Sequence, residues 1–180
     1  QIPIARYANL IEFALLEHYG GTWIDSTVYL TDPIPDMILN SDFFAVRNSL
    51  LLIDNPVLYP AWFLHAKKGN KTIREIRNVA FAYWLKNEHV IEYLLPNLII
   101  TLVVKSNPEF EQEIPYMNSD YSEYLVKVLA DDYSEEKWNW IKKLTGIHEL
   151  TYKLDAAVNR KDSFYQQIGR ASCRERGVFA

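Results

Sequence analysis

The sequence predicts an α/β fold in which a mixed sheet is flanked by helices, and three observations support this prediction. Short segments with strand-like alternation or apolar runs come between longer segments with helical spacing, as in domains whose helices cover a sheet. Apolar residues make up 49% and aromatic residues 14% of the 180 residues, which is typical of a folded chain. This length fits one domain with a substantial core.

The first predicted element is a helix that begins at Pro3 and ends at Gly20-Gly21. Proline suits a first helical turn because its missing N–H is not needed there. Two glycines end a helix because they tolerate a left-handed backbone and the close approach of another group. The helix carries an apolar stripe at helical spacing that consists of Ile4, Ala8, Ile11 and Leu15.

A strand over 22–30 is predicted next. Side chains alternate between the two faces of a strand, which gives one face made of Trp23, Asp25, Thr27 and Tyr29. A carboxylate near a strand end, beside small and hydroxyl residues, is suited to holding a divalent cation against a phosphate. Asp25 is therefore the first candidate metal ligand, and its alternative role is to cap a neighbouring loop.

The rest of the chain alternates between further strands and helices. Asn70 and Ser134 are placed to cap the helices that follow them, and Pro96 is expected to kink a helix. The expected elements are a helical turn at 36–39, strands over 42–47 and 58–66, a helix after Asn70, and helices over 88–104, 119–130 and 135–144. Polar loops are expected over 49–57 and 107–117.

Charge and cysteine content exclude several classes of protein. The only cysteine is Cys173, so the body of the chain has no disulfide, zinc–thiolate site or thiol nucleophile. The formal charge is −4, and it becomes −6 without the arginine-rich end. Such an acidic body is not expected to bind nucleic acid. The most apolar run, 94–104, is too short for a membrane span, which needs roughly 20 residues. We interpret it as a buried helix that could touch a membrane surface.

The end of the chain differs in character from the body. From Ile168 onwards the sequence I-G-R-A-S-C-R-E-R is arginine-rich and has no apolar periodicity. This segment is similar to the translation of a sequencing adapter. We therefore expect residues 168–180 to come from read-through into the adapter and not from the native protein. The alternative is a basic tail. The residues before it, 158–167, are expected to end the domain or form a linker.

Three segments resemble the capsular polysaccharide synthesis family of sugar transferases, which is related to glycosyltransferases with a D-x-D motif. They are L-L-E-H-Y-G-G-T-W-I-D-S-T at 15–27, W-F-L-H-A-K-K-G-N at 62–70 and I-H-E-L-T-Y-K at 147–153. The resemblance implies a GT-A-like fold, with 1–157 forming part of a catalytic domain. Strands that precede the first helix in this family are missing here, so the resemblance implies a fragment.

The resemblance also implies roles for particular residues. Asp25 and His148 would bind a divalent cation, Mn²⁺ or Mg²⁺, while Lys153 would contact the donor diphosphate. Thr27 stands where the second acid of D-x-D is found, and it would bind a phosphate, a water or the sugar. Asn9 would bind a ribose or base, whereas the acid Glu12 replaces an arginine of many relatives. His148 and Lys153 are otherwise a surface histidine on a loop and a solvated lysine.

Asp54 is a weak candidate for a catalytic base or for orienting a hydroxyl. The alternative interpretation is a turn made by Asp54, Asn55 and Pro56.

The resemblance implies a bacterial-type glycosyltransferase that moves a sugar from a nucleotide-diphosphate donor onto a glycan during capsular or surface polysaccharide synthesis. Its partners would be that donor and a glycan acceptor. It would be cytoplasmic, with possible peripheral association at the inner face of the membrane. Two alternatives remain open: a non-catalytic glycan-binding or scaffold protein with the same fold, and a helical interaction domain in which 22–30 is not a strand.

Overall fold

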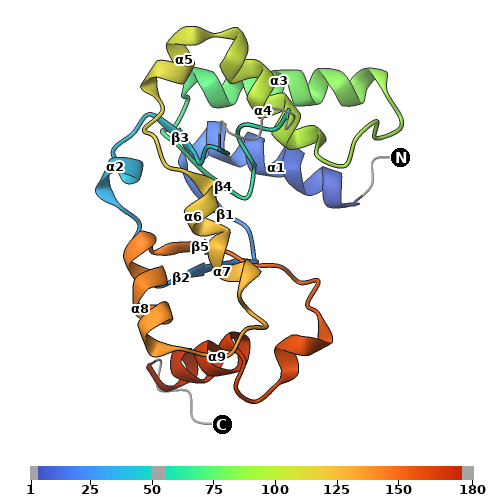
Figure 1. Ribbon diagram of the computed structural model, residues 1–180. Helices are drawn as coiled ribbons and strands as arrows, with labels where there is room; N and C mark the ends of the chain where they lie inside the picture. Colours follow the sequence, from blue (N-terminus) through green and yellow to red (C-terminus); the bar gives the residue numbers. More distant parts are fainter. Residues whose placement is uncertain (1–3, 50–55, 176–180) are drawn as a thin grey trace. The chain divides into compact units, whose positions relative to one another are not determined.

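The computed structural model describes residues 4–49 and 56–175, and it divides into two compact units (Figure 1). Unit 1 comprises Gln1–Asp25 and Ile34–Ser119, and unit 2 comprises Ser26–Pro33 and Asp120–Ala180. The segment 26–33 therefore leaves unit 1 directly after Asp25 and joins the C-terminal part of the chain. The boundaries at 157 and 167 that the sequence suggested stay predictions.

Unit 1 packs three long helices against a small sheet (Figure 1). The strands have the order β1-β4-β3, and both pairings are antiparallel, with Gly21 and Phe43 opposite Ala66. The core lies between the sheet and the helices, and its largest enclosed side chains include Phe13 and Tyr59. The elements are α1 (Ile4–Tyr19), β1 (Gly21–Ile24), α2 (Asp36–Leu39), β3 (Phe43–Ala45), β4 (Phe63–Ala66), α3 (Lys71–Lys86), α4 (Leu95–Ser106) and α5 (Pro108–Glu113).

Unit 2 contains a two-stranded antiparallel sheet with short helices around it. Tyr29 lies opposite His148 in this sheet. A second core cluster is built around Trp138, Ile141 and Phe164. The elements are β2 (Val28–Leu30), α6 (Ser119–Ser122) at the unit boundary, α7 (Tyr124–Lys127), α8 (Glu135–Leu144), β5 (Ile147–Glu149), a 3₁₀ helix (Ala156–Asn159) and α9 (Phe164–Glu175).

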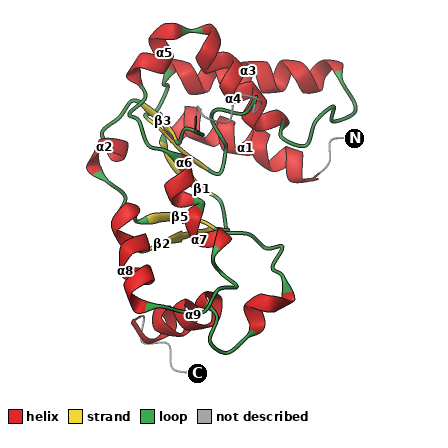
Figure 2. Cartoon of the chain, in the orientation of Figure 1, coloured by secondary structure: helices red, strands yellow, loops and turns green. Residues whose placement is uncertain are grey.

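The α/β class is confirmed, but the sheets differ from the predicted mixed sheet. Among the described residues, the strands form two small sheets rather than one (Figure 2), and their strand pairings are antiparallel. The predicted strand over 22–30 is divided because the chain turns at Ser26 and Thr27. Its first part pairs with β4 in unit 1 and its second part with β5 in unit 2. The single alternating face predicted for this strand is therefore interrupted.

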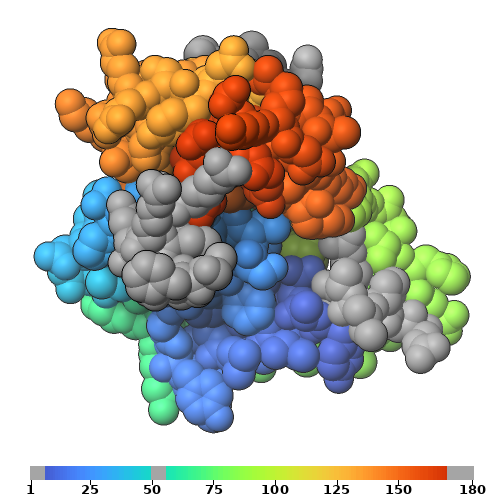
Figure 3. Space-filling view, turned by 90° about the horizontal axis from the view of Figure 1, so that it is seen from below, coloured from blue at the N-terminus to red at the C-terminus, as the bar shows by residue number. Residues whose placement is uncertain are grey.

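Helix α1 buries a different stripe from the one indicated by the sequence. Leu10, Phe13 and Leu16 are in the core, whereas Ile11 and Leu15 are 44% and 42% exposed. The helix is apolar on both sides, so spacing alone could not identify the buried one. The α1 residues, dark blue in the space-filling view, contribute to the visible surface (Figure 3).

Two proline-containing segments also differ from prediction. Helix α4 starts at Leu95, so Pro96 lies in its first turn, where it begins the helix instead of kinking it. The burial expected for this segment is confirmed, since Ile100 and Val104 are fully enclosed. The expected loop over 107–117 contains α5, which also has a proline in its first turn. Among the helices described, none has the length and apolar character needed to cross a membrane.

The predicted helix caps are confirmed. The side chain of Asn70 accepts a hydrogen bond from the backbone N–H of Ile73, and that of Ser134 accepts one from Lys137. Helix α9 runs across the predicted read-through boundary, and Ile168 packs in the core of unit 2. The non-native origin of 168–180 stays a prediction.

Candidate functional site

Asp25 directly follows β1 and is fixed from two directions. Its backbone N–H donates to the carbonyl of Trp62 at 3.0 Å, which continues the pairing of the sheet. The indole Nε1–H of Trp23 donates to Oδ1 of Asp25 at 2.9 Å. Burial raises the pKa of the Asp25 carboxyl, and the bond from Trp23 opposes that rise. The sequence placed Trp23 and Asp25 on one face of the strand, and their hydrogen bond confirms that part of the prediction.

Glu12 is a second carboxyl of unit 1, and its pKa is affected by the charge of Asp25. It lies on α1, and its residue is 0% exposed. The side-chain amide of Asn9, one turn earlier, donates to Oε2 of Glu12 at 3.1 Å. Burial raises the pKa of Glu12 well above its usual value, Asn9 lowers it, and the negative charge of Asp25 raises it further. Asn9 and Glu12 therefore form a hydrogen-bonded pair on one side of α1, within the influence of the Asp25 charge.

The second carboxyl oxygen of Glu12 is Oε1. Oε1 is buried, and no residue in the part of the chain that the structure describes forms a hydrogen bond with it. A buried polar oxygen without a partner costs roughly 1–3 kcal/mol, and more if it is charged. Glu12 and Asp25 are therefore the leading candidate residues of unit 1.

The donor set fits Mg²⁺ or Mn²⁺. Mg²⁺ is usually bound through one or two carboxylates and completes its shell with water and substrate phosphates. Asp25 and Glu12 could supply the carboxylates. No three His, Cys, Asp or Glu side chains within residues 4–49 and 56–175 converge as a complete protein cage. A cation held here would therefore depend on a phosphate-bearing ligand.

A small apolar pocket lies next to Asn9, between α1, α3 and α4. Asn9 is its polar wall residue, so the same side chain borders the pocket and holds Glu12. The remaining lining residues are Leu10, Phe13, Ala80, Trp84, Leu95, Pro96 and Ile99.

His148 lies in unit 2, in strand β5, and is 0% exposed. Its ring is near the rings of Tyr29 and Trp138, with centroid distances of 6.3 and 6.2 Å. Nε2 is 3.1 Å from the hydroxyl of Thr31, and buried Nδ1 has no partner among the described residues. Burial lowers the pKa of His148 to about 4, against a smaller effect of Asp32. It is thus not the surface histidine of the alternative interpretation.

Thr27 and Lys153 also belong to unit 2. Thr27 lies in the turn before β2, and its carbonyl accepts the N–H of Leu150 at 3.0 Å. Lys153 is exposed, and its ammonium lies 5.6 Å from the ring centre of Tyr152. A solvent-exposed lysine without a functional role can have the same contact with a neighbouring ring, so this arrangement also fits the alternative interpretation of Lys153.

The structure groups Asn9 with Asp25 in unit 1, whereas Thr27, His148 and Lys153 belong to unit 2. Their functional roles stay predictions, and Asp54 lies outside the described residues. The sequence did not reveal that Glu12 is buried. Its position three residues after Asn9, next to buried Phe13, could have indicated burial on the same side of α1.

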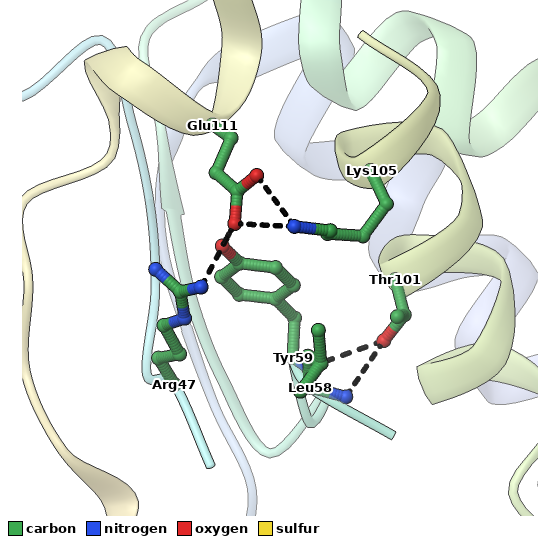
Figure 4. A network of polar contacts seen from close by, with 6 residues as sticks. All are labelled: Arg47, Leu58, Tyr59, Thr101, Lys105 and Glu111. Atoms are coloured by element: carbon green, nitrogen blue, oxygen red, sulfur yellow. Dashed lines mark hydrogen bonds and ion pairs between the residues drawn. The ribbon is translucent and has the colours of Figure 1, made fainter. Parts of the chain in front are cut away.

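Between β3 and β4, a polar network joins Arg47 and Tyr59 to helices α4 and α5 (Figure 4). Glu111 accepts hydrogen bonds from Tyr59 at 3.1 Å and Lys105 at 2.8 Å, and it pairs with Arg47 at 3.0 Å. The hydroxyl of Thr101 accepts the backbone N–H groups of residues 58 and 59 at 3.0 and 3.2 Å. The network therefore ties α4 and α5 to this part of the chain.

Replacing Glu111 with Gln should destabilise unit 1 by about 1–2 kcal/mol, because two cations lose their shared anionic partner. The free energy of unfolding in urea at pH 7 measures this effect. Glu113→Gln is the matched control, since Glu113 is exposed on the same helix. Equal losses in both variants would show that the network contributes nothing specific.

The comparison with protein families adds one positive finding. The model of the capsular polysaccharide synthesis protein family matches residues 1–168. No curated protein matches the chain. The matched range includes both units' candidate residues, from Asn9 to Lys153, and it confirms the resemblance of the three segments. The chain belongs to the capsular polysaccharide synthesis protein family.

Proposed function

We propose that the chain is part of a GT-A-like glycosyltransferase that moves a sugar from a nucleotide-diphosphate donor onto a glycan in capsular polysaccharide synthesis. The observation that carries this proposal is the half-buried Asp25 carboxyl directly after β1, one oxygen of which is fixed by the indole N–H of Trp23. Membership of the family gives the biosynthetic context.

Transfer of the sugar leaves negative charge on the diphosphate as the glycosidic bond breaks. A bound Mn²⁺ or Mg²⁺ supplies electrostatic stabilisation of that charge. Asp25 would hold the cation through one carboxylate oxygen while the indole N–H of Trp23 fixes the other. Asn9, whose amide already orients Glu12, would contact the ribose or base. The roles of His148 as a ligand, Lys153 as a diphosphate contact and Thr27 as polar support are proposed from the family resemblance alone.

The proposed acceptor is a growing glycan, and the proposed location is the cytoplasmic face of the membrane. Exposed apolar side chains near the end of α3 support peripheral contact with a lipid surface. Leu85 is 86% exposed, Ile91 77% and Tyr93 65%. Aromatic and aliphatic side chains of this kind are favoured at the boundary between headgroups and acyl chains.

Asp25→Asn tests the proposed activity directly. Mn²⁺-dependent release of nucleoside diphosphate is measured for the whole chain with a panel of UDP-, GDP-, CDP- and dTDP-sugars. We expect a loss of about 100-fold or more in the variant, because an amide replaces the charged ligand. Asp42→Asn is the control, since Asp42 forms an exposed ion pair with Lys67.

One observation favours the non-catalytic alternative. Thr27 is a neutral hydroxyl at the place of the second acid, and the structure assigns it to unit 2 while Asp25 belongs to unit 1. A glycan-binding scaffold would bind glycan but release no diphosphate from any donor, with or without Asp25. Equal hydrolysis by the wild type and Asp25→Asn would instead remove Asp25 from the proposed chemistry.

A further inference from the structure

The solvent-facing side of α1 carries a row of apolar side chains. Tyr7, Ile11, Leu15 and Tyr19 repeat every four residues, so they lie along one side of the helix. Their exposed fractions lie between 42% and 70%. Exposed apolar side chains that adjoin one another usually mark an interaction surface, because a soluble surface helix normally presents polar residues to water.

Helix α3 extends this row. The two helices are in contact (Figure 1), and the guanidinium of Arg77 on α3 pairs with Glu17 of α1 at 3.1 Å. Phe81 and Leu85 follow Arg77 at intervals of four residues, so they belong to the side of α3 that runs beside α1. Both are exposed, while both helices bury their other side in the core. We call the six side chains the α1–α3 surface: Tyr7, Ile11, Leu15, Tyr19, Phe81 and Leu85.

The loop after α3 presents two more exposed apolar side chains, Ile91 and Tyr93. Its backbone is held by the hydroxyl of Tyr83, which donates to the carbonyl of His89 at 2.7 Å and accepts the N–H of Ile91 at 3.3 Å. These two bonds fix the loop on both sides of residue 90. Ile91 is therefore held in its exposed position by contacts within unit 1.

Positive charge is concentrated beside this surface. The whole chain has a formal charge of −4, but residues 67–94 contain six basic and three acidic residues, a net of +3. Lys68, Lys71 and Lys86 are exposed and form no ion pair with any residue that the structure describes. Lys68 adjoins the end of α1, since the N–H of Gly69 donates to the carbonyl of Glu17 at 2.8 Å. The α1–α3 surface thus has a border of lysines.

This combination favours an anionic lipid surface over a second copy of the chain. Tyrosine and aliphatic side chains suit the boundary between headgroups and acyl chains, and neighbouring lysines are attracted to anionic headgroups. A second copy docked on the same surface would bring its own lysine border towards this one, and like charges across an interface oppose binding.

We propose that the α1–α3 surface and its lysine border bind membranes that contain anionic lipids. This inference rests on the location given in the proposed function, and it names both the lipid chemistry and the face of the chain that contacts it. The apolar side chains enter the outer part of the acyl region. The ammonium groups of Lys68, Lys71 and Lys86 contact the lipid phosphates, with their aliphatic stems lying along the apolar surface.

Sedimentation of the whole chain with vesicles tests this inference in the absence of any sugar donor. The wild type should bind phosphatidylcholine vesicles with roughly 30% phosphatidylglycerol about tenfold more tightly than vesicles of phosphatidylcholine alone. Raising NaCl from about 0.1 M to about 1 M should weaken the binding by about tenfold, because salt screens the lysines. Equal binding to both kinds of vesicle, or binding that salt does not change, would overturn the inference.

Ile11→Gln tests the apolar part of the surface. It should weaken vesicle binding by about fivefold or more, because a polar side chain no longer gains from leaving water. Leu39→Gln is the matched control, since Leu39 on α2 has the same exposed fraction as Ile11, 44%. The control should change binding less than about twofold. Equal losses in the two variants would contradict a role for α1.

The lysine border is tested by the double variant Lys68→Gln and Lys71→Gln. It should weaken binding to the anionic vesicles by about tenfold or more. Lys127→Gln with Lys143→Gln removes the same charge from exposed positions in unit 2 and should have an effect of less than about twofold. Circular dichroism checks that each variant is folded. If the Lys68 and Lys71 variant binds like the wild type, the lysine border has no part in binding and the inference fails.

The outcomes separate this inference from the proposed function. Diphosphate release from soluble donors, compared between the wild type and Asp25→Asn without vesicles, tests the chemistry and does not depend on lipid binding. A wild type that binds no vesicles overturns the lipid inference and leaves the chemistry standing. Light scattering in the absence of lipid covers the remaining occupant. A dimeric wild type that binds no vesicles, with a monomeric Ile11→Gln, would assign the surface to self-association and overturn the inference.

Discussion

Gly20→Ala is expected to lower the free energy of unfolding of unit 1 by about 3 kcal/mol or more. Gly20 has φ +71°, a backbone conformation that costs an alanine roughly 1–2 kcal/mol. A Cβ at this position would also lie 2.6 Å from the backbone nitrogen of Lys68 and 3.1 Å from the carbonyl oxygen of Ala66. Backbone atoms cannot move aside as a flexible side chain does, so the turn between α1 and β1 must shift.

Gly21→Ala is the matched comparison. Gly21 also has a positive φ, +106°, but a Cβ there meets nothing within 4 Å. It should show the backbone cost of about 1–3 kcal/mol without the steric cost. Urea unfolding monitored by circular dichroism measures both variants. Equal destabilisation would show that the close approach of Lys68 has no energetic role.

The structure around this turn could be predicted from the sequence. Two consecutive glycines and a following acid are local features, and the structure confirms the helix end at Tyr19 and the sheet beside Asp25. The caps at Asn70 and Ser134 were also predictable because each depends on residues within one turn.

The remaining features depend on long-range pairing. No local signal shows that 22–24 pairs with β4 while 28–30 pairs with β5, more than 110 residues later in the chain. The buried side of α1 was equally undetermined, because Ile11 and Leu15 are as apolar as Leu10 and Phe13. For the same reason, the sequence did not show that Glu12 lies on the side of α1 that packs.

Acidification from pH 7.5 to pH 5 is expected to reduce the stability of the wild type by about 2 kcal/mol more than that of His148→Gln. The pKa of His148 is lowered from 6.5 to about 4 because the ring is buried. In the unfolded chain, the histidine takes up a proton as the pH falls through 6.5. The folded chain takes it up only near pH 4, so between these values protonation favours unfolding.

His148→Gln removes this titration and retains a side chain that can bond to Thr31. Urea unfolding of both proteins at pH 7.5 and pH 5 gives the four free energies that are needed. The other ionisable groups contribute equally to both proteins, so they cancel in the double difference. A wild type and variant with the same pH dependence would show that the ring is accessible to protons in the folded state.

The two acids in unit 1 should respond to pH in the opposite direction. The pKa values of Glu12 and Asp25 are raised by burial, so the cost of their negative charges is present at high pH and is lost as the pH falls through the folded values. Unit 1 should therefore gain stability from these groups under the conditions in which His148 weakens unit 2. Hydrogen exchange of α1 and β5 amides, corrected for intrinsic rates, measures the two effects separately. Parallel changes in both elements would show that the units unfold together and that neither group controls its own unit.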